Sequence, residues 1–225
     1  MSACGVCHTE LDEIEGRTAP PRLPVVPGHE VVGRVDKLGA GATRFAVGDR
    51  IGIGWIHSSS GSADENLSPL FRATGRDVDG GYAEFMTAPE TYAYPVPAVF
   101  SDAEAAPLLC AGGVGYRSLK LAAIRDGEVL GLTGFGGSGH LVLQMAKHLY
   151  PDSPVCVFAR SGQERTFAAE LGADWAGDTE ASKGGAGDGH VAGLRAPDRE
   201  DLSAGSPAAR RRGRPRSACP GRAWP

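Results

Sequence analysis

VLGLTGFGGSGH, residues 129–140, carries the clearest structural pattern in the second half of this chain. VLGLT is a continuous apolar run typical of a buried strand, and the GFGGSG that follows contains Gly134, Gly136, Gly137 and Gly139. Glycines at this spacing, between a strand and a helix, permit a tight turn and a close approach of a pyrophosphate to the helix start. The stretch therefore predicts a dinucleotide-binding turn at these four glycines.

The residues after this turn repeat the pattern of strand and helix. The apolar side chains expected on one face of the first helix are Leu141, Val142, Met145 and Leu149. VCVFA at 155–159 predicts a second strand, ERTFAAELGA predicts a second helix that ends at Gly172, and ADWAGD predicts the start of a third strand. We therefore expect an incomplete Rossmann-type βαβα unit, of the α/β class, over residues 101–178.

The end of the second predicted strand bears on the choice of nucleotide. An NAD-binding protein places Asp or Glu there to bind the ribose hydroxyls, whereas this chain has Arg160 and Ser161. An arginine suits the 2′-phosphate of NADP. We expect NADP in preference to NAD, and a surface arginine without this role is the alternative interpretation.

Residues 1–100 have a different organisation. Short Val, Ile and Leu runs broken by Gly and Pro fill residues 22–56, and GGYAEFMTA at 80–88 and TYAYPVP at 91–97 read as two further strands. This pattern predicts a small antiparallel barrel. From Ser101, which forms a capping box with Glu104, an apolar helical run begins.

Three scattered residues form a candidate zinc site. Cys7, His29 and Cys110 supply two thiolates and one imidazole, which leave a tetrahedral zinc with an open position and so favour a catalytic over a structural ion. The pair Cys4 and Cys7 alone would also fit a redox site or half of a zinc knuckle, and His29 alone would be read as an ordinary loop histidine. The sequence has no second CxxC, which a zinc knuckle would need. No predicted strand precedes the CxxC at residues 4–7, as one would in a thioredoxin-like site.

A family resemblance connects these fragments. CGVCHTEL, PGHEVVGRV, GDRIGIGW, DVDGGYAEF, APLLCAGGVGYRSLK and GFGGSGH, in this order within residues 1–178, resemble the zinc-dependent medium-chain alcohol dehydrogenases. The resemblance implies a partial GroES-like catalytic barrel followed by a partial Rossmann domain. It also implies interconversion of a primary alcohol and its aldehyde, by hydride transfer to and from NADP or NAD.

The resemblance assigns roles to individual residues. The implied metal ligands are Cys7, His29 and Cys110, with Glu30 as an alternate fourth ligand. Thr9 would hydrogen-bond the bound alcohol and start a proton relay, and His8 would lie near the cofactor. Glu10 would orient the zinc-binding histidine through its second ring nitrogen.

One departure from the family concerns a second metal. Members often hold a structural zinc with four clustered cysteines, but the corresponding loop here has no cysteine and carries Ser60, Ser62 and Ser68. Because hydroxyls are poor zinc ligands, we expect one catalytic zinc and no structural zinc.

Residues 179–225 differ in character from the rest of the chain. These 47 residues hold 9 Ala, 8 Gly, 8 Arg and 5 Pro, a composition that predicts disorder. We expect an out-of-frame tail in place of the family's remaining strands, and the start at Met1 suggests that the first barrel strands are missing too. The alternative function is therefore an inactive remnant of the enzyme, and we do not expect a family-type homodimer because the sheet edge is missing. RRRGRPR at 210–216 leaves DNA binding as a distant alternative.

Composition sets the remaining limits. The net charge of −4 argues against a nucleic-acid role for the whole chain, and no stretch approaches about 18 consecutive apolar residues. Five cysteines, an odd number, fit metal ligands in a reducing compartment better than a disulfide framework. We expect a cytoplasmic enzyme without a membrane partner.

Overall fold

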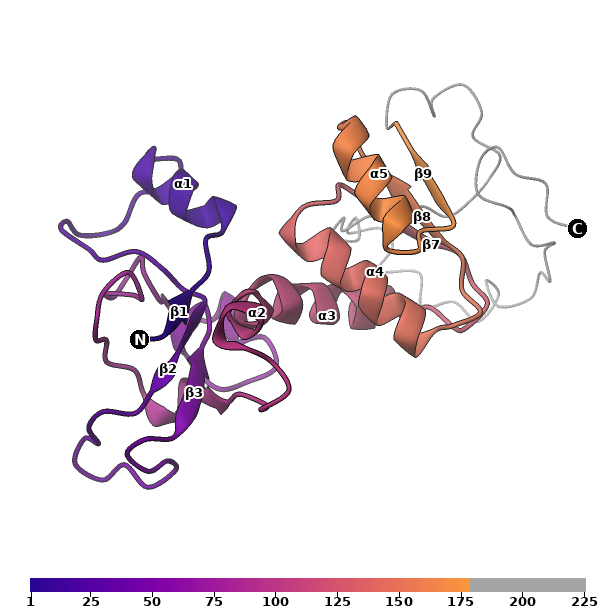
Figure 1. Cartoon of the computed structure of the whole chain (residues 1–225). Helices are drawn as coiled ribbons and strands as arrows, with labels where there is room; N and C mark the ends of the chain where they lie inside the picture. Colours follow the sequence, from indigo (N-terminus) through magenta and orange to yellow (C-terminus); the bar gives the residue numbers. More distant parts are fainter. Residues whose placement is uncertain (179–225) are drawn as a thin grey trace, which may run out of the picture. The chain divides into compact units, whose positions relative to one another are not determined.

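The computed structural model describes residues 1–178 (Figure 1). The chain divides into two compact units, Met1–Gly113 and a second that begins at Val114. The expectations of disorder and an out-of-frame origin for residues 179–225, and of DNA binding at 210–216, lie outside the described residues. Each unit is considered below by itself.

The first unit is built on an open antiparallel sheet with the strand order β1-β2-β3-β6. Its strands are β1 (Ala3–Cys4), β2 (Val31–Arg34), β3 (Arg50–Ile53) and β6 (Ala93–Pro95). A separate pair joins β4 (Ile56–Ser58) to β5 (Arg72–Ala73). The remaining short elements before residue 100 are α1 (His8–Ile14) and the 3-10 turns η1 (Glu65–Leu67) and η2 (Glu90–Tyr92).

Strand β2 is buried on both faces of this sheet: Val31 and Val32, as successive residues of a strand, point to opposite sides and both are buried. Val31 packs with Ile53 and Ala93 in one apolar cluster. Val32 packs on the other face with Ala105 and Ala106. The second cluster fixes the chain after residue 100 against the sheet, and this contact brings the distant Cys110 into the first unit.

The apolar run after Ser101 is interrupted rather than continuous. Ser101 caps α2 (Asp102–Ala105), where its hydroxyl accepts from the backbone of Glu104 at 3.3 Å, so the predicted capping box is present. The 3-10 segment η3 (Ala106–Leu109) follows, and α3 (Ala111–Ala122) begins only after a break at Cys110. The backbone of Cys110 (φ −127°, ψ −75°) is not helical.

The strand predicted over residues 80–88 is wrong, whereas part of the strand predicted over 91–97 forms as β6. Residues 80–82 use their backbone N–H groups to bind the loop at 26–28 instead of a neighbouring strand. Residues 84–88 border a hollow of about 790 Å³, which Val31 and Ile51 of the sheet also line. Within residues 1–178 the barrel is therefore partial and does not close.

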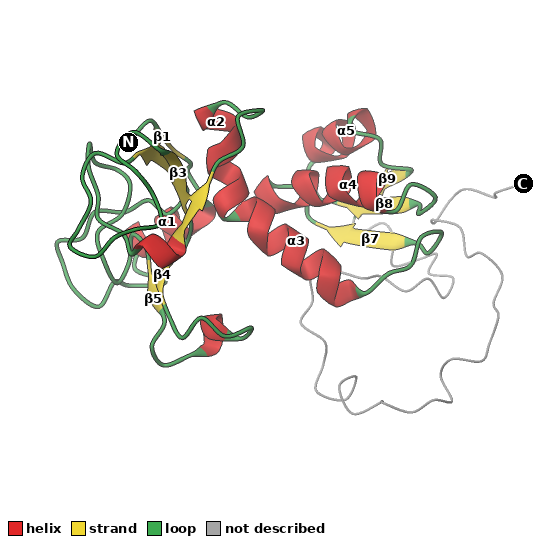
Figure 2. Ribbon diagram, turned by 90° about the horizontal axis from the view of Figure 1, so that it is seen from below, coloured by secondary structure: helices red, strands yellow, loops and turns green. Residues whose placement is uncertain are grey.

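The second unit matches the expected α/β pattern. Strands β7 (Leu130–Thr133), β8 (Val155–Phe158) and β9 (Trp175–Gly177) lie parallel in that order. Helices α4 (Gly137–Leu149) and α5 (Gly162–Glu170) connect them and cover the same face of the sheet (Figures 1 and 2). The strand–helix alternation predicted from the sequence is thus present over the described part of this unit.

The apolar face predicted for the first of these helices is rotated. Leu149 is 44% exposed, whereas Leu143 and Ala146 are fully buried together with Val142. The buried positions Gly139, Val142, Leu143 and Ala146 follow the i, i+3, i+4, i+7 spacing of one helix face. The predicted set shares only Val142 with this face and lacks both Leu143 and the small residue Ala146, so the face was placed about one position away from the true one.

Among the described residues, no helix combines the length and the apolar character needed to cross a bilayer.

Candidate metal centre and nucleotide turn

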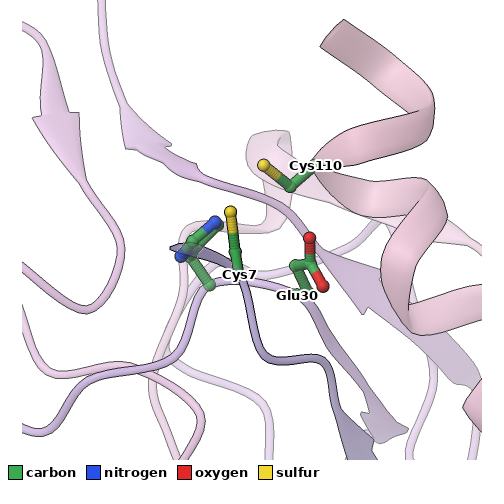
Figure 3. Close-up of side chains that lie close together, drawn as sticks. Cys7, Glu30 and Cys110 are labelled. Carbon is green, nitrogen blue, oxygen red and sulfur yellow. The ribbon is translucent and has the colours of Figure 1, made fainter. Parts of the chain in front are cut away.

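Four side chains of the first unit bring metal-binding atoms together. Cys7, His29, Glu30 and Cys110 each offer one donor atom, and these atoms all lie within 4.8 Å of one another. Figure 3 shows the sulfur atoms of Cys7 and Cys110 pointing toward each other, with the Glu30 carboxylate beside them. Within residues 1–178 this is the one such group of histidine, cysteine and acidic side chains.

Each donor lies at the end of a regular element. Cys7 is the N-cap of α1, His29 and Glu30 directly precede β2, and Cys110 occupies the break between η3 and α3. Segment ends free their side chains from the packing of a continuous helix or strand. The pairing of Cys4 with Val31 and the packing of Ala105 and Ala106 on Val32 hold the three segments against β2.

Glu10 supports two of the donors at once. Its Oε2 accepts from the backbone N–H of Cys7 at 2.8 Å, and its Oε1 lies 2.5 Å from Nδ1 of His29. Both Glu10 and His29 are almost fully buried. A contact on Nδ1 fixes the ring orientation and leaves Nε2 as the donor for a metal.

The donor set fits a tetrahedral zinc ion. Zinc bonds of about 2.0–2.3 Å to nitrogen and sulfur place neighbouring ligand atoms about 3.3–3.8 Å apart, so the donors need only a small contraction from their present spacing. Gly5 provides room for the fourth donor, because a Cβ at Gly5 would lie 1.9 Å from Oε2 of Glu30. Two sulfurs, one imidazole and one carboxylate are ligands that zinc accepts.

Three of the four donors, Cys7, His29 and Cys110, are linked by side-chain hydrogen bonds that shift their pKa values. Hydrogen bonds from Cys110 and His29 lower the pKa of Cys7 to about 3. Burial opposes the charged form of His29, but Cys7 and Glu10 outweigh it and raise the pKa of His29 to about 10. The hydrogen bond to Cys7, together with burial, raises the pKa of Cys110. Burial also raises the pKa of Glu30, which favours the protonated form of that carboxyl.

Thr9 and His8, on the first turn of α1, occupy different positions. Oγ1 of Thr9 lies 3.6 Å from Sγ of Cys7, which puts a hydroxyl beside the donor group. His8 is exposed and its Nε2 lies 3.8 Å from Asp12. The structure thus brings Thr9 to the candidate metal centre, and the expectation for His8 stays a prediction.

The loop that carries Ser60, Ser62 and Ser68 uses these hydroxyls in hydrogen bonds within the loop itself. Ser60 and Ser62 share a hydrogen bond of 2.7 Å, Ser62 donates to Asp64 at 2.9 Å, and Ser68 accepts from the backbone of Leu70 at 3.2 Å. Hydrogen bonds within the loop provide the local order of this segment.

The glycine turn of the second unit has the backbone that the sequence predicts. Gly134 has φ +79°, and a Cβ at Gly139 would lie 2.8 Å from the Gly134 carbonyl oxygen. Gly136 is the N-cap of α4, and Gly137 is the first residue of the helix. The space around Gly134 and Gly136 is open on this unit, so a phosphate can approach the helix start there.

Arg160 and Ser161 follow β8, as predicted, but a third residue shapes their turn. Arg160 is exposed, and the Ser161 hydroxyl caps α5 by accepting from Glu164. Arg165 donates to the carbonyls of Ala159 (2.9 Å) and Arg160 (2.7 Å). Sequence reasoning missed Arg165, because nothing in its spacing from the strand indicates that the side chain folds back onto this turn.

The sequence of this chain is similar to those of known alcohol dehydrogenases. Residues 1–98 match the alcohol dehydrogenase GroES-like domain. A probable alcohol dehydrogenase AdhA of Mycobacterium tuberculosis is 46% identical over 189 residues, which are 79% of this chain and 54% of that protein. An alcohol dehydrogenase of Geobacillus stearothermophilus is 39% identical over 181 residues, 77% of this chain and 53% of that protein.

The structure of this chain is also similar to solved structures of dehydrogenases. A putative zinc-binding dehydrogenase of Sinorhizobium meliloti, bound to NADP, superposes with a TM-score of 0.71 at 30% identity. The match covers 81% of this chain and 54% of that one. Residues 1–98 therefore form an alcohol dehydrogenase GroES-like domain, the chain is similar to zinc-type medium-chain alcohol dehydrogenases, and it spans about half the length of the curated relatives it matches.

Proposed function

We propose that this chain carries the zinc-dependent catalytic centre of an alcohol oxidoreductase that interconverts a primary alcohol and its aldehyde with NADP. The observation that carries the proposal is the convergence of the donor atoms of Cys7, His29, Glu30 and Cys110. Three of these donors come from segments far apart in the sequence, and a chance meeting of two thiols and an imidazole is a poor explanation for such a group.

The four donors would not all bind the zinc ion in the same way. Cys7 and Cys110 would bind as thiolates and His29 through Nε2, while Glu30 would serve as an alternate fourth ligand. When bound, zinc supplies a Lewis acid that favours deprotonation of an alcohol at neutral pH. A reducing cytosol, which keeps both cysteines as thiols, is the compartment that suits this site.

Neighbouring side chains would orient the donors and move the proton. Glu10 would hold His29 in the tautomer that presents Nε2, and it would fix the Cys7 backbone at the same time. Thr9, whose hydroxyl lies beside Cys7, would accept the proton of the alcohol and pass it toward solvent. His8 would act near the cofactor.

The second unit would bind the nucleotide. Backbone N–H groups at Gly136, Gly137 and Gly139 would hold the pyrophosphate at the start of α4. Arg160 would pair with the 2′-phosphate of NADP, next to the N-terminus of α5. NADP supplies the hydride acceptor for the alcohol.

A direct assay tests the proposal. The purified 225-residue chain, loaded with one equivalent of Zn²⁺, is mixed with a simple primary alcohol and NADP, and NADPH formation is followed by absorbance. We expect turnover that depends on zinc and is lost in Cys110→Ser.

Two other outcomes have distinct meanings. Zinc binding at Cys7, His29 and Cys110 without turnover would support the inactive remnant. Absence of stoichiometric zinc binding by the folded chain would reject the metal centre itself.

A further inference from the structure

A short segment of the first unit, Gly80–Tyr82, binds the loop that carries His29 and Glu30. Its backbone N–H groups donate to the residues just before His29: Gly80 to Val26 at 2.7 Å, Gly81 to Gly28 at 2.9 Å and Tyr82 to Pro27 at 3.0 Å. Three consecutive bonds of this kind fix the path of the loop. The segment therefore does more than connect two parts of the chain.

The side chain of Tyr82 reaches the other donor loop. Its Oη donates to the carbonyl of Gly5 at 3.1 Å, two residues before Cys7. The N–H of Gly5 in turn donates to the carbonyl of Glu30 at 2.9 Å. Both backbone polar groups of Gly5 are thus hydrogen-bonded: its N–H binds Glu30, and its carbonyl binds Tyr82.

Gly28 lets the tyrosine ring lie close to the loop. A Cβ at Gly28 would be 2.8 Å from Cδ1 of Tyr82 and 2.9 Å from Sγ of Cys4, and Gly28 has φ +100°. Both the space and the backbone conformation therefore require glycine at this position. The ring of Tyr82 thus lies close to the loop before His29, and its hydroxyl binds the loop before Cys7.

We infer that Tyr82 is a positioning residue for the metal donors, which fixes the loop before Cys7 relative to the loop before His29. Tyr82 is not itself a donor and acts through Gly5 and Gly28. This role rests on the proposed function, because it presupposes that Cys7 and His29 bind the same metal ion. The competing interpretation is that Tyr82 only stabilises the unit, in which case its loss would lower stability without altering the site.

The test uses the full chain with the variants Tyr82→Phe and Tyr82→Ala. Tyr94→Phe is the matched control, because Tyr94 lies on β6 of the same unit and is 45% exposed, against 41% for Tyr82. Zn²⁺ affinity is measured by competition with a chromophoric chelator, and donor geometry is read from the visible absorption of the Co²⁺-loaded protein. Thermal unfolding of the metal-free chain gives the stability of each variant.

We expect Tyr82→Phe to weaken Zn²⁺ binding about fivefold through the loss of one hydrogen bond, and Tyr82→Ala to weaken it roughly 10–100-fold. The Co²⁺ absorption of both variants should shift, and Tyr94→Phe should match the unmodified chain. If Tyr82→Ala does not fold, Tyr82→Phe decides the test.

Unchanged Zn²⁺ affinity and Co²⁺ absorption in Tyr82→Phe would overturn the inference and leave the proposed function standing. A loss of affinity that merely follows a lower unfolding temperature, with an unaltered Co²⁺ spectrum, would also overturn it. An unmodified chain that binds neither ion would instead reject the proposed function.

Discussion

The metal centre and the nucleotide turn present two different ways of building a site. The donors Cys7, His29 and Cys110 come from three segments that lie far apart in the sequence, and only the sheet of the first unit brings them together. The glycine turn lies within one short stretch, Gly134–Gly139, between one strand and one helix. Its geometry depends mainly on the local backbone.

The two sites should respond differently to substitution. A site assembled from distant segments depends on the contacts that hold those segments, such as Glu10 with Cys7 and His29. A local turn depends on the backbone freedom and the small size of its own residues. Substitutions in one unit should therefore affect its own ligand and leave the ligand of the other unit nearly unchanged.

The largest effect is expected from removing a metal donor. Cys7→Ser should weaken Zn²⁺ binding roughly 100-fold or more, because a tetrahedral zinc site totals about 10–16 kcal/mol over its ligands. Serine is a favoured helix N-cap, so α1 should be preserved and the loss should reflect the donor itself. Chelator competition measures the affinity, with Cys4→Ser as the control. Equal affinity in both variants would contradict the ligand assignment.

The next effect concerns the carboxylate that orients the donors. Glu10→Gln should weaken Zn²⁺ binding roughly 10–100-fold, since the charge opposite His29 is lost while the shape of the side chain is kept. Glu15→Gln, an exposed position just after the same helix, is the matched control and should bind as the unmodified chain does. Titration with Zn²⁺ of both variants checks this, and an unchanged Glu10→Gln would show that Glu10 does not support the site.

A smaller effect is expected at the nucleotide turn. Gly139→Ala places a Cβ 2.8 Å from the Gly134 carbonyl oxygen, and such overpacking typically costs about 1–3 kcal/mol. We expect NADPH binding, followed by nucleotide fluorescence, to weaken about tenfold, while Zn²⁺ affinity stays constant. Gln144→Ala, at an exposed position farther along the same helix, is the control. A parallel loss of Zn²⁺ affinity would break the independence of the two sites.

The smallest effect concerns the choice of nucleotide. Arg160→Ser should weaken NADP binding about fivefold relative to NAD, because a single exposed ionic hydrogen bond contributes about 1 kcal/mol. Isothermal titration with both nucleotides measures the ratio, and Arg125→Ser, another exposed arginine of this unit, should leave it unchanged. An equal ratio of NADP to NAD affinity in the two variants would show that Arg160 does not bind the 2′-phosphate.

The sequence predicted local structure better than packing. The turn at Gly134–Gly139, the strands β7, β8 and β9 and the Ser101 cap follow from short-range patterns, and all of them form. The strand over 80–88 was predicted wrongly, because residues 80–82 bind a loop instead of a neighbouring strand. The predicted face of α4 is right at Val142 but not at Leu149, and it leaves out the buried Leu143 and Ala146.

The candidate site shows the same division. The residue types at Cys7, His29, Glu30 and Cys110, together with the family resemblance, are enough to name the donor set from the sequence. Neither Tyr82 nor Arg165 could be identified in that way, because each acts on backbone carbonyls, which every residue carries and which no sequence pattern marks.

From the sequence alone, this chain offers two cysteines and a histidine, residue types that bind zinc, and a glycine turn whose spacing suits a pyrophosphate. Those properties belong to individual residues and to short stretches of backbone. Only the tertiary structure decided that the donors meet, that helix α3 begins just after Cys110, and that Glu10 contacts both Cys7 and His29. The physical reason is that these contacts join segments whose separation along the chain carries no information about their distance in space, until burial of Val32 with Ala105 and Ala106 fixes it.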